Sequence, residues 1–316
     1  MNGKIKIVEC VPNFSEGRNE KTINAISSAV EGTSGAKLLD VHSDKDYNRS
    51  VLTFAGEPRA VLGAAFNSVK KASELIDMRS HSGEHPCVGA IDVVPFVPVR
   101  GTTMEECVSL ARELGEKVAS VLGIPVYLYA RAAEKPERKE LAEIRKGGYE
   151  ALAEKIREEK WRPDFGSAEF SPKSGACIVG ARDFLIAFNV DLDTGDAAKA
   201  GEIASAVREF PRGLGGVRAI GVFLKERGIA QVSTNLLDFE RTGMHQAFEA
   251  VKSKAGELGC NAVAGEVIGM VPRKALLDAG RFYSHASKER ELIEAAIRGL
   301  KLRDFSAEKR IIENRV

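Results

Sequence analysis

The sequence lacks the marks of several classes of protein. Its 46 Lys and Arg nearly balance its 45 Asp and Glu, so no excess of basic charge favours DNA phosphates or an anionic membrane as a partner. The longest apolar stretches, such as residues 88–99, are about ten residues long, which is too short to cross a bilayer. Glu9 and Pro12 follow the basic Lys4 and Lys6 before the apolar core of a secretory signal could form, so we expect no leader.

Cysteine is scarce as well. The five cysteines are an odd number, lie far apart and form no CxxC pair; they are Cys10, Cys87, Cys107, Cys177 and Cys260. This usage is typical of reduced, mostly buried thiols and predicts a cytoplasmic protein. A catalytic thiolate at Cys87 stays open, because a neighbouring histidine can activate a thiol.

Nucleotide-binding loops are also missing. No GxxxxGK[ST] pattern occurs, and no GxGxxG follows an expected strand. The triplet 164–166 spells Asp-Phe-Gly as in protein kinases, but neither an HRD segment nor a glycine-rich loop accompanies it. We therefore expect no nucleotide binding through such loops.

Hydrophobic periodicity predicts an order of strands and helices that occurs twice. In the first half we expect strands over 4–10, 36–41, 50–55, 91–99 and 126–130, and helices over 20–31, 59–76 and 104–122 with two short ones near Leu141 and Tyr149. In the second half we expect strands over 184–190, 217–224 and 230–237, and helices over 197–210 and 244–258. Pro95 and Pro98 favour an edge or bulged position for the strand over 91–99.

Both halves thus open in the order β-α-β-β-α, which argues against a Rossmann sheet and indicates the ferredoxin-like arrangement. The predicted fold class is α+β, with two ferredoxin-like α/β sandwich subdomains over residues 1–180 and 181–316. A charged, weakly periodic loop over 158–174 joins them. A substrate cleft is expected between the subdomains.

One candidate site is the segment from His81 to His85, which matches the HxxEH pattern of inverted zinc proteases. Such chemistry needs both histidines on one helical face, with His42 as the only plausible third histidine ligand. Gly83 disfavours a helix, and Pro86 moves His85 out of the helical region, so we expect a loop instead. A loop histidine before a buried strand is a candidate acid or base, and the alternative is a solvated or capping imidazole.

The polar turn after His42 is a second candidate. It contains Asn48 and Arg49, and a planar guanidinium such as that of Arg49 can bind a carboxylate through two hydrogen bonds. The alternative is a solvated turn. A third segment is either a binding loop or a linker. Its residues are Gly166, Ser167, Ala168, Glu169, Phe170, Ser171, Pro172, Lys173, Ser174 and Gly175.

Several runs of residues resemble one known family. They span nearly the whole chain: Val8–Gly17, Asn48-Arg49, Gly83–Pro86, Asp92-Val93, Pro125–Tyr129, Asp164–Gly166, Gly180–Arg182, Gln231–Phe239, Lys274–Asp278 and Arg310–Glu313. These runs resemble the glutamate formimidoyltransferases, the formiminotransferase part of the formiminotransferase-cyclodeaminase family. Two departures are visible: no cyclodeaminase part follows, and His42 stands where the animal enzymes carry an acidic residue.

The resemblance implies transfer of a formimino group from N-formimino-L-glutamate to N5 of tetrahydrofolate, the co-substrate, in histidine degradation. It implies His85 as the catalytic histidine, the segment 166–175 as folate-binding, and a homodimer. It implies that the protein uses no metal and binds neither nucleic acid nor a membrane. With a separate cyclodeaminase expected downstream, 5-formiminotetrahydrofolate should accumulate without catalytic release of ammonia.

Three alternatives stay open. The protein transfers a formyl group between 5-formyltetrahydrofolate and glutamate, it is a noncatalytic folate-binding partner of another enzyme, or it is a zinc hydrolase through His81 and His85.

Overall fold

The computed structural model describes residues 5–210 and 212–316, in two units. The first unit ends at Asp183 and the second begins at Phe184. The expected boundary after residue 180 falls inside the strand β7 (Cys177–Ala181) of the first unit. Lys4, the first residue of the expected strand 4–10, lies outside the described residues. None of the described helices is long and apolar enough to cross a membrane.

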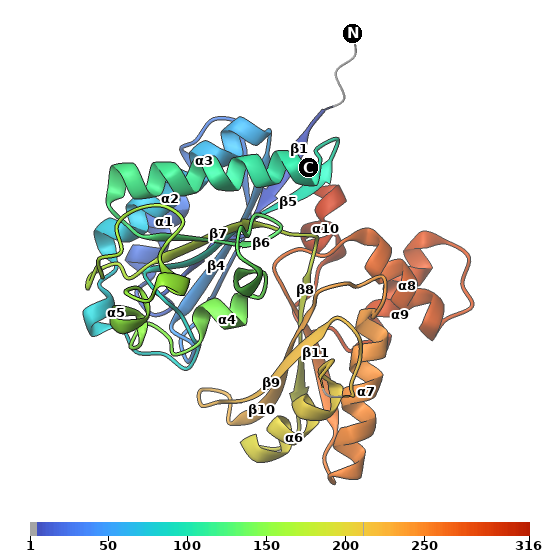
Figure 1. The fold of residues 1–316 in the computed structure, drawn as a ribbon. Coiled ribbons are helices and arrows are strands. Elements are labelled where there is room, and N and C mark those ends of the chain that lie inside the picture. The colour runs from blue at the N-terminus through green and yellow to red at the C-terminus, as the bar shows by residue number, and fades with distance from the viewer. Residues whose placement is uncertain (1–4, 211) are drawn as a thin grey trace. The chain divides into compact units, whose positions relative to one another are not determined.

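The first unit contains one sheet with helices on both faces (Figure 1). Its strands are β1 (Ile7–Cys10), β2 (Asn13–Phe14), β3 (Ala36–Asp44), β4 (Arg49–Gly56), β5 (Ile91–Arg100), β6 (Val126–Ala130) and β7. Its helices are α1 (Glu20–Glu31), α2 (Pro58–Leu75), α3 (Met104–Leu122), α4 (Leu141–Arg145) and α5 (Leu152–Lys155), with 3-10 turns η1 (Met78–Ser80), η2 (Pro136–Arg138) and η3 (Glu159–Trp161).

The ferredoxin-like arrangement is present in this sheet. β3 pairs with β4, β4 with β1, and β1 with β5, and each of these pairs is antiparallel. Beyond β5 the sheet continues through β7 to β6 in parallel pairings. Hydrophobic periodicity predicted no strand at β7, because five apolar residues beside a polar loop carry little periodicity.

Local sequence explains the helices of the first unit. α1 buries Ile23, Ile26 and Val30 at helical spacing, and the side chain of Asn19 caps its first turn. α3 begins with a capping box between Thr103 and Glu106. α1, α2 and α3 cover one face of the sheet, and α4 packs on the other (Figure 1).

The strand β5 lies in the middle of the sheet, so the edge position expected from its prolines is wrong. The bulge expected there is confirmed, because the register shifts where Pro98 pairs with Val8. Pro95 lies opposite the break between β1 and β2, where its carbonyl accepts a hydrogen bond from the backbone N–H of Val11 at 3.3 Å. A central strand therefore tolerates prolines that stand beside breaks in the ladder.

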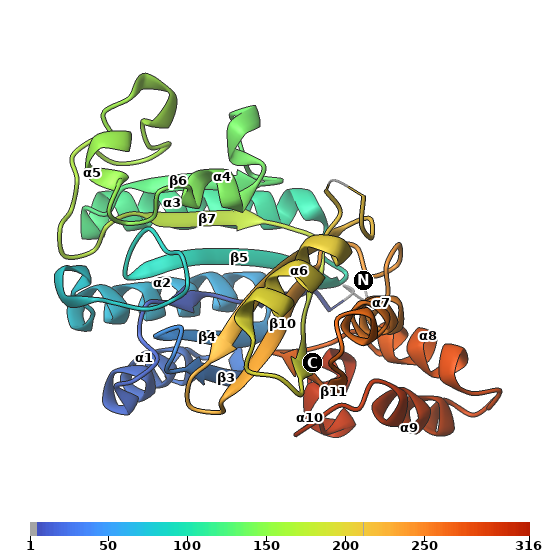
Figure 2. The same ribbon diagram turned by 90° about the horizontal axis from the view of Figure 1, so that it is seen from below.

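The second unit is a four-stranded antiparallel sheet in the ferredoxin-like order β11-β8-β10-β9. Its elements are β8 (Ile186–Leu192), α6 (Ala197–Val207), β9 (Val217–Leu224), β10 (Ile229–Leu236), α7 (Met244–Glu257), β11 (Ala262–Ile268), α8 (Arg273–Tyr283), α9 (Glu289–Gly299), α10 (Ala307–Arg310) and η4 (Ile312–Asn314). α6 and α7 bury one face of the sheet, and α8 lies beside α9 (Figure 2). Hydrophobic periodicity predicted neither β11 nor α8–α10.

Candidate functional site

The segment that carries His85 is a loop between η1 and β5, as predicted. Its glycine allows it to lie against the turn between β3 and β4. A Cβ at Gly83 would lie 2.3 Å from the carbonyl oxygen of Tyr47, so no larger residue fits there without movement. The backbone N–H of Glu84 donates to the carbonyl of Asp46 at 3.2 Å.

Asn48 joins this loop to two other segments. Its backbone is left-handed, with φ of 47°, and its side chain is buried. Its Oδ1 accepts from the N–H of Gly17 at 2.9 Å, and its Nδ2 donates to the carbonyl of Ser82 at 3.0 Å and lies 3.3 Å from Nδ1 of His81. Because these contacts occupy the amide, the structure favours a positioning role for Asn48; substrate binding by Asn48 stays a prediction.

His85 contacts Arg49, the first residue of β4. Nη1 of Arg49 lies 2.8 Å from Nε2 of His85 and donates to Oδ1 of Asn13 at 3.0 Å. A guanidinium is only a donor, so Nε2 must accept and the neutral ring must carry its proton on Nδ1. The Tyr47 ring completes the surroundings, with its centroid 5.5 Å from that of His85.

The imidazole of His85 is neutral in this environment. Burial, followed by the positive charges of Arg49 and Arg145, lowers the pKa of His85 to about 2. Burial and the nearby Arg145 also lower the pKa of Arg49, to about 10, which leaves the guanidinium charged at neutral pH. The site therefore combines a neutral imidazole with a cation.

Arg145 and Asp92 are site residues that the sequence analysis did not pair. Arg145, at the end of α4, forms a two-fold hydrogen-bonded ion pair with the buried Asp92 of β5. From its sequence position Asp92 is expected within reach of His85, but its carboxylate accepts hydrogen bonds from Arg145 and, at 3.1 Å, from the N–H of Val88. The sequence did contain one indication of this ion pair. Asp92 is the only carboxylate in the apolar run 90–99, and a buried carboxylate requires a polar or charged partner.

The predicted folate segment 166–175 lies beside the His85 loop at its C-terminal end. The N–H of Ala90 donates to the carbonyl of Ser174 at 2.9 Å, and Gly89 forms a bridge with Gly175. A Cβ at Gly175 would lie 2.2 Å from the carbonyl oxygen of Val88, and φ there is +64°. Ser167, Glu169 and Lys173 are exposed, whereas Phe170 and Ser171 in the middle of the segment are half-buried.

His42 lies on the outer strand β3, where it pairs with Val51 of β4. Cross-strand partners point to the same face, and residues two apart on a strand share that face. His42 therefore lies on the same sheet face as Arg49, two positions along the ladder.

The alternatives of a thiol nucleophile and a zinc site receive no support from this geometry. Burial and the charge of Asp92 raise the pKa of Cys87 to about 11, so its thiol is protonated at neutral pH. Nε2 of His85 faces the cation of Arg49, and Nδ1 of His81 faces Asn48. Within residues 5–210 and 212–316, no three His, Cys, Asp or Glu side chains are placed to hold a metal.

Glu9 is a further buried acid that the sequence analysis did not single out. This residue of β1 is 2% exposed, and burial raises the pKa of its carboxyl to about 7 against the opposing effect of Arg182. By alternation along β1, Glu9 points away from the core residues Val8 and Cys10.

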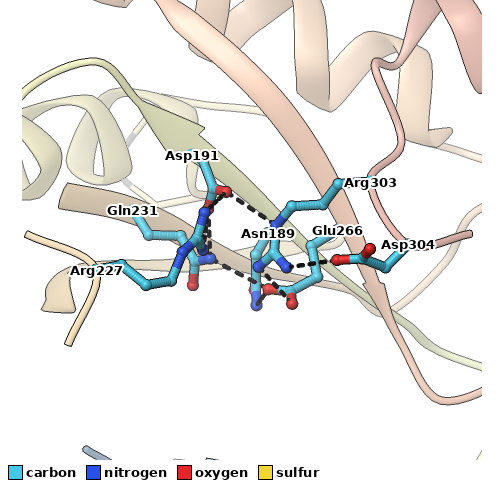
Figure 3. A network of polar contacts seen from close by, with 7 residues as sticks. All are labelled: Asn189, Asp191, Arg227, Gln231, Glu266, Arg303 and Asp304. Atoms are coloured by element: carbon cyan, nitrogen blue, oxygen red, sulfur yellow. Dashed lines mark hydrogen bonds and ion pairs between the residues drawn. The ribbon is translucent and has the colours of Figure 1, made fainter. Parts of the chain in front are cut away.

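The second unit holds a polar network on the sheet face opposite α6 and α7 (Figure 3). Asp191 of β8 accepts hydrogen bonds from Arg227 at 2.6 Å, Gln231 at 2.7 Å and Arg303 at 3.0 Å. Glu266 of β11 pairs with the same Arg303. Burial alone would raise the pKa of Asp191, but the hydrogen bonds from Arg227 and Gln231 hold it below its usual value.

Comparison with known proteins now gives the class of this two-unit α+β protein. The model of the formiminotransferase domain, N-terminal subdomain, matches residues 7–182, and that of the formiminotransferase domain matches residues 187–316. The chain belongs to the formiminotransferase domain family, which confirms the resemblance found in the sequence.

Its relatives include proteins of two lengths. The formimidoyltransferase-cyclodeaminase of Rattus norvegicus is 47% identical over 322 residues, which cover 98% of this chain and 59% of the rat protein. The glutamate formimidoyltransferase of Thermoplasma acidophilum is 48% identical over 281 residues, or 88% of this chain and 92% of that protein. The glutamate formimidoyltransferase of Streptococcus pyogenes serotype M1 is 43% identical over 309 residues, or 98% of each chain. The chain thus spans about three fifths of the rat relative and nearly all of the latter two.

Proposed function

We propose that this protein transfers the formimino group of N-formimino-L-glutamate to N5 of tetrahydrofolate, with His85 as general acid and base. The observation that carries the proposal is a neutral imidazole held in a loop against two arginines. The names of the relatives from Thermoplasma and Streptococcus support this choice of substrates.

The chemistry needs one group that accepts a proton and then returns it. N5 attacks the amidine carbon to form a tetrahedral intermediate, and the departing glutamate nitrogen must be protonated before it leaves. An imidazole takes the proton from N5 and gives it to that nitrogen, which typically contributes about 10²- to 10⁴-fold to the rate. Holding both substrates side by side contributes the rest, and neither a covalent intermediate nor a metal is required.

The surrounding residues suit substrates that carry carboxylates. Arg49, whose Nη1 contacts Nε2 of His85, and Arg145 place two guanidinium groups near the imidazole. The segment 166–175, which abuts the His85 loop, is the proposed folate-binding segment, and His42 and Asn48 stay proposed contacts of the glutamate side. A homodimer in the cytoplasm also belongs to the proposal.

The test is an assay of the purified protein with tetrahydrofolate and N-formimino-L-glutamate. We expect formation of 5-formiminotetrahydrofolate together with L-glutamate. A parallel reaction with 5-formyltetrahydrofolate and L-glutamate examines the formyl alternative. Product in the second reaction alone would overturn the proposed donor, and product in neither would overturn the proposed activity.

A further inference from the structure

The proposed chemistry needs a free lone pair on His85, yet the structure shows this lone pair in use. Nε2 accepts from Nη1 of Arg49, and the same Nη1 donates to Asn13, so both N–H groups of Nη1 are committed. Nδ1 of His85 is buried and has no partner of normal hydrogen-bond geometry among the described residues. In this arrangement neither ring nitrogen can take a proton from N5.

The charges around His85 show what could change the arrangement. Arg49 faces it from β4 and Arg145 from α4, while Asp92 of β5 is paired with Arg145. Asp44 and the Tyr47 hydroxyl are the other titratable groups that act on Arg49. The charges that act on the His85 ring itself are those of Arg49 and Arg145, and both disfavour an imidazolium.

Arg49 also has unused donors. In the described part of the chain, its Nε and Nη2 donate no hydrogen bond, whereas Nη1 donates only to neutral acceptors. The Nε–Nη2 edge of a guanidinium matches a carboxylate through two parallel hydrogen bonds. Hydrogen bonds to a carboxylate are about twice as strong as those to a neutral acceptor, so a carboxylate competes well for this guanidinium.

We propose that Arg49 caps Nε2 of His85, and that a substrate carboxylate bound by Arg49 draws the guanidinium away and frees Nε2 to accept the proton. This inference rests on the proposed role of His85. It makes Arg49 a positioning residue, because the base becomes available only when the carboxylate is bound. The bound carboxylate also offsets the charge of Arg49, which removes one cause of the low pKa of His85.

The first test is NMR of the whole protein with 13Cε1-labelled histidine. The five histidines are assigned with single variants such as His85→Gln. Without ligand, the His85 signal should not titrate between pH 5 and 8 and should report the Nδ1–H tautomer. Saturating L-glutamate should shift the signal and bring its titration into this range.

Tetrahydrofolate alone is a second arm, because its tail also ends in carboxylates. We expect L-glutamate to release the cap, and release by tetrahydrofolate alone would assign the carboxylate to the folate. Titration near the ordinary pKa without ligand, or no response to either ligand, would overturn the inference.

The second test uses diethyl pyrocarbonate, which acylates a free neutral imidazole. Arg49→Met removes the donor, so His85 should be acylated about tenfold faster than in the original protein. His81 lies in the same tryptic peptide, residues 80–100, and its rate should stay unchanged. Arg18→Met is the matched control, because Arg18 is exposed and its Nε donates to Lys45 instead. Equal rates at His85 in all three proteins would overturn the cap.

These results are separable from the fate of the proposed function. If His85→Gln abolishes transfer but the His85 signal of the original protein changes with neither ligand, the proposed function stands and the cap is wrong. If the ligands release His85 but His85→Gln transfers normally, the cap stands and the catalytic role of His85 is wrong.

Discussion

The two units carry polar clusters of opposite character. In the second unit, Asp191 binds Arg227, Arg303 and Gln231, and Glu266 binds the latter two, so charges of both signs are paired. In the first unit, Arg49 donates only to neutral acceptors among the described residues, and His85 is neutral beside it. The second unit thus holds a network closed on itself, and the first holds a cluster in which Arg49 has donors that no described residue uses. A closed network stabilises a fold, whereas an open one can bind and react.

The largest expected effect is on catalysis in the first unit. His85→Ala should lower kcat by about two to four decades, because general acid–base catalysis is lost. His85→Gln should lower kcat as much, since its amide oxygen restores an acceptor for Arg49 but cannot shuttle a proton. Steady-state kinetics with N-formimino-L-glutamate measure both variants.

The control is His81→Ala, which should cost much less because His81 contacts Asn48 and not Arg49. Comparable losses at His81 and His85, together with sensitivity to chelators, would favour the zinc alternative. Near-normal kcat in both variants of His85 would end its assignment as the proton shuttle.

The second unit should respond in stability instead. Asp191→Asn leaves Arg227 and Arg303 without their shared carboxylate and should lower the free energy of unfolding by about 3 kcal/mol. The kcat per folded molecule should be unchanged. Urea unfolding gives the stability. Asp304→Asn is the matched control, because Asp304 also contacts Arg303 but its side chain is 89% exposed. Equal effects of the two substitutions would contradict the idea of a closed network.

A third prediction concerns Glu9 and pH. Its pKa is raised to about 7, so the protonated carboxyl contributes stability that is present below about pH 4.5 and lost as the pH rises through 7. Glu9→Gln should therefore exceed the original protein in stability by less than about 1 kcal/mol at pH 5 and by up to roughly 3 kcal/mol at pH 8. Thermal unfolding at both pH values measures the difference, with the exposed Glu116→Gln as a control. A benefit of equal size at pH 5 would show that ionisation is not the cause.

The smallest expected effect is on substrate affinity. Arg49→Ala should raise KM for one carboxylate-bearing substrate about tenfold, because that substrate loses a charge-assisted hydrogen bond. The loss is no larger because, in the original protein, part of the free energy of that bond is spent on breaking the contact between Arg49 and His85. The kcat should fall less than KM rises. Varying each substrate in turn identifies the one affected. An unchanged KM for both substrates would show that Arg49 binds neither substrate carboxylate.

The sequence predicted what depends on near neighbours. Gly83 and Pro86 forbid a helix at His85 through their own backbone preferences, so the loop followed from the chain alone. The alternation of strand and helix patterns likewise revealed the order β-α-β-β-α in both halves. Strands in which local cues were weak or misleading, such as β7 and the proline-containing β5, were missed or misplaced.

The sequence by itself therefore determined the repeated α+β order, the loop at His85 and the family. Only the tertiary structure decided the partners: Arg49 meets His85 across 36 residues, and Arg145 meets Asp92 across 53. Contacts at such separations depend on how strands align in the sheet, and periodicity within one strand carries no information about that register. The tautomer of His85, the burial of Glu9 and the unused edge of Arg49 follow from these contacts, because a pKa and a free donor are properties of the surroundings and not of the residue.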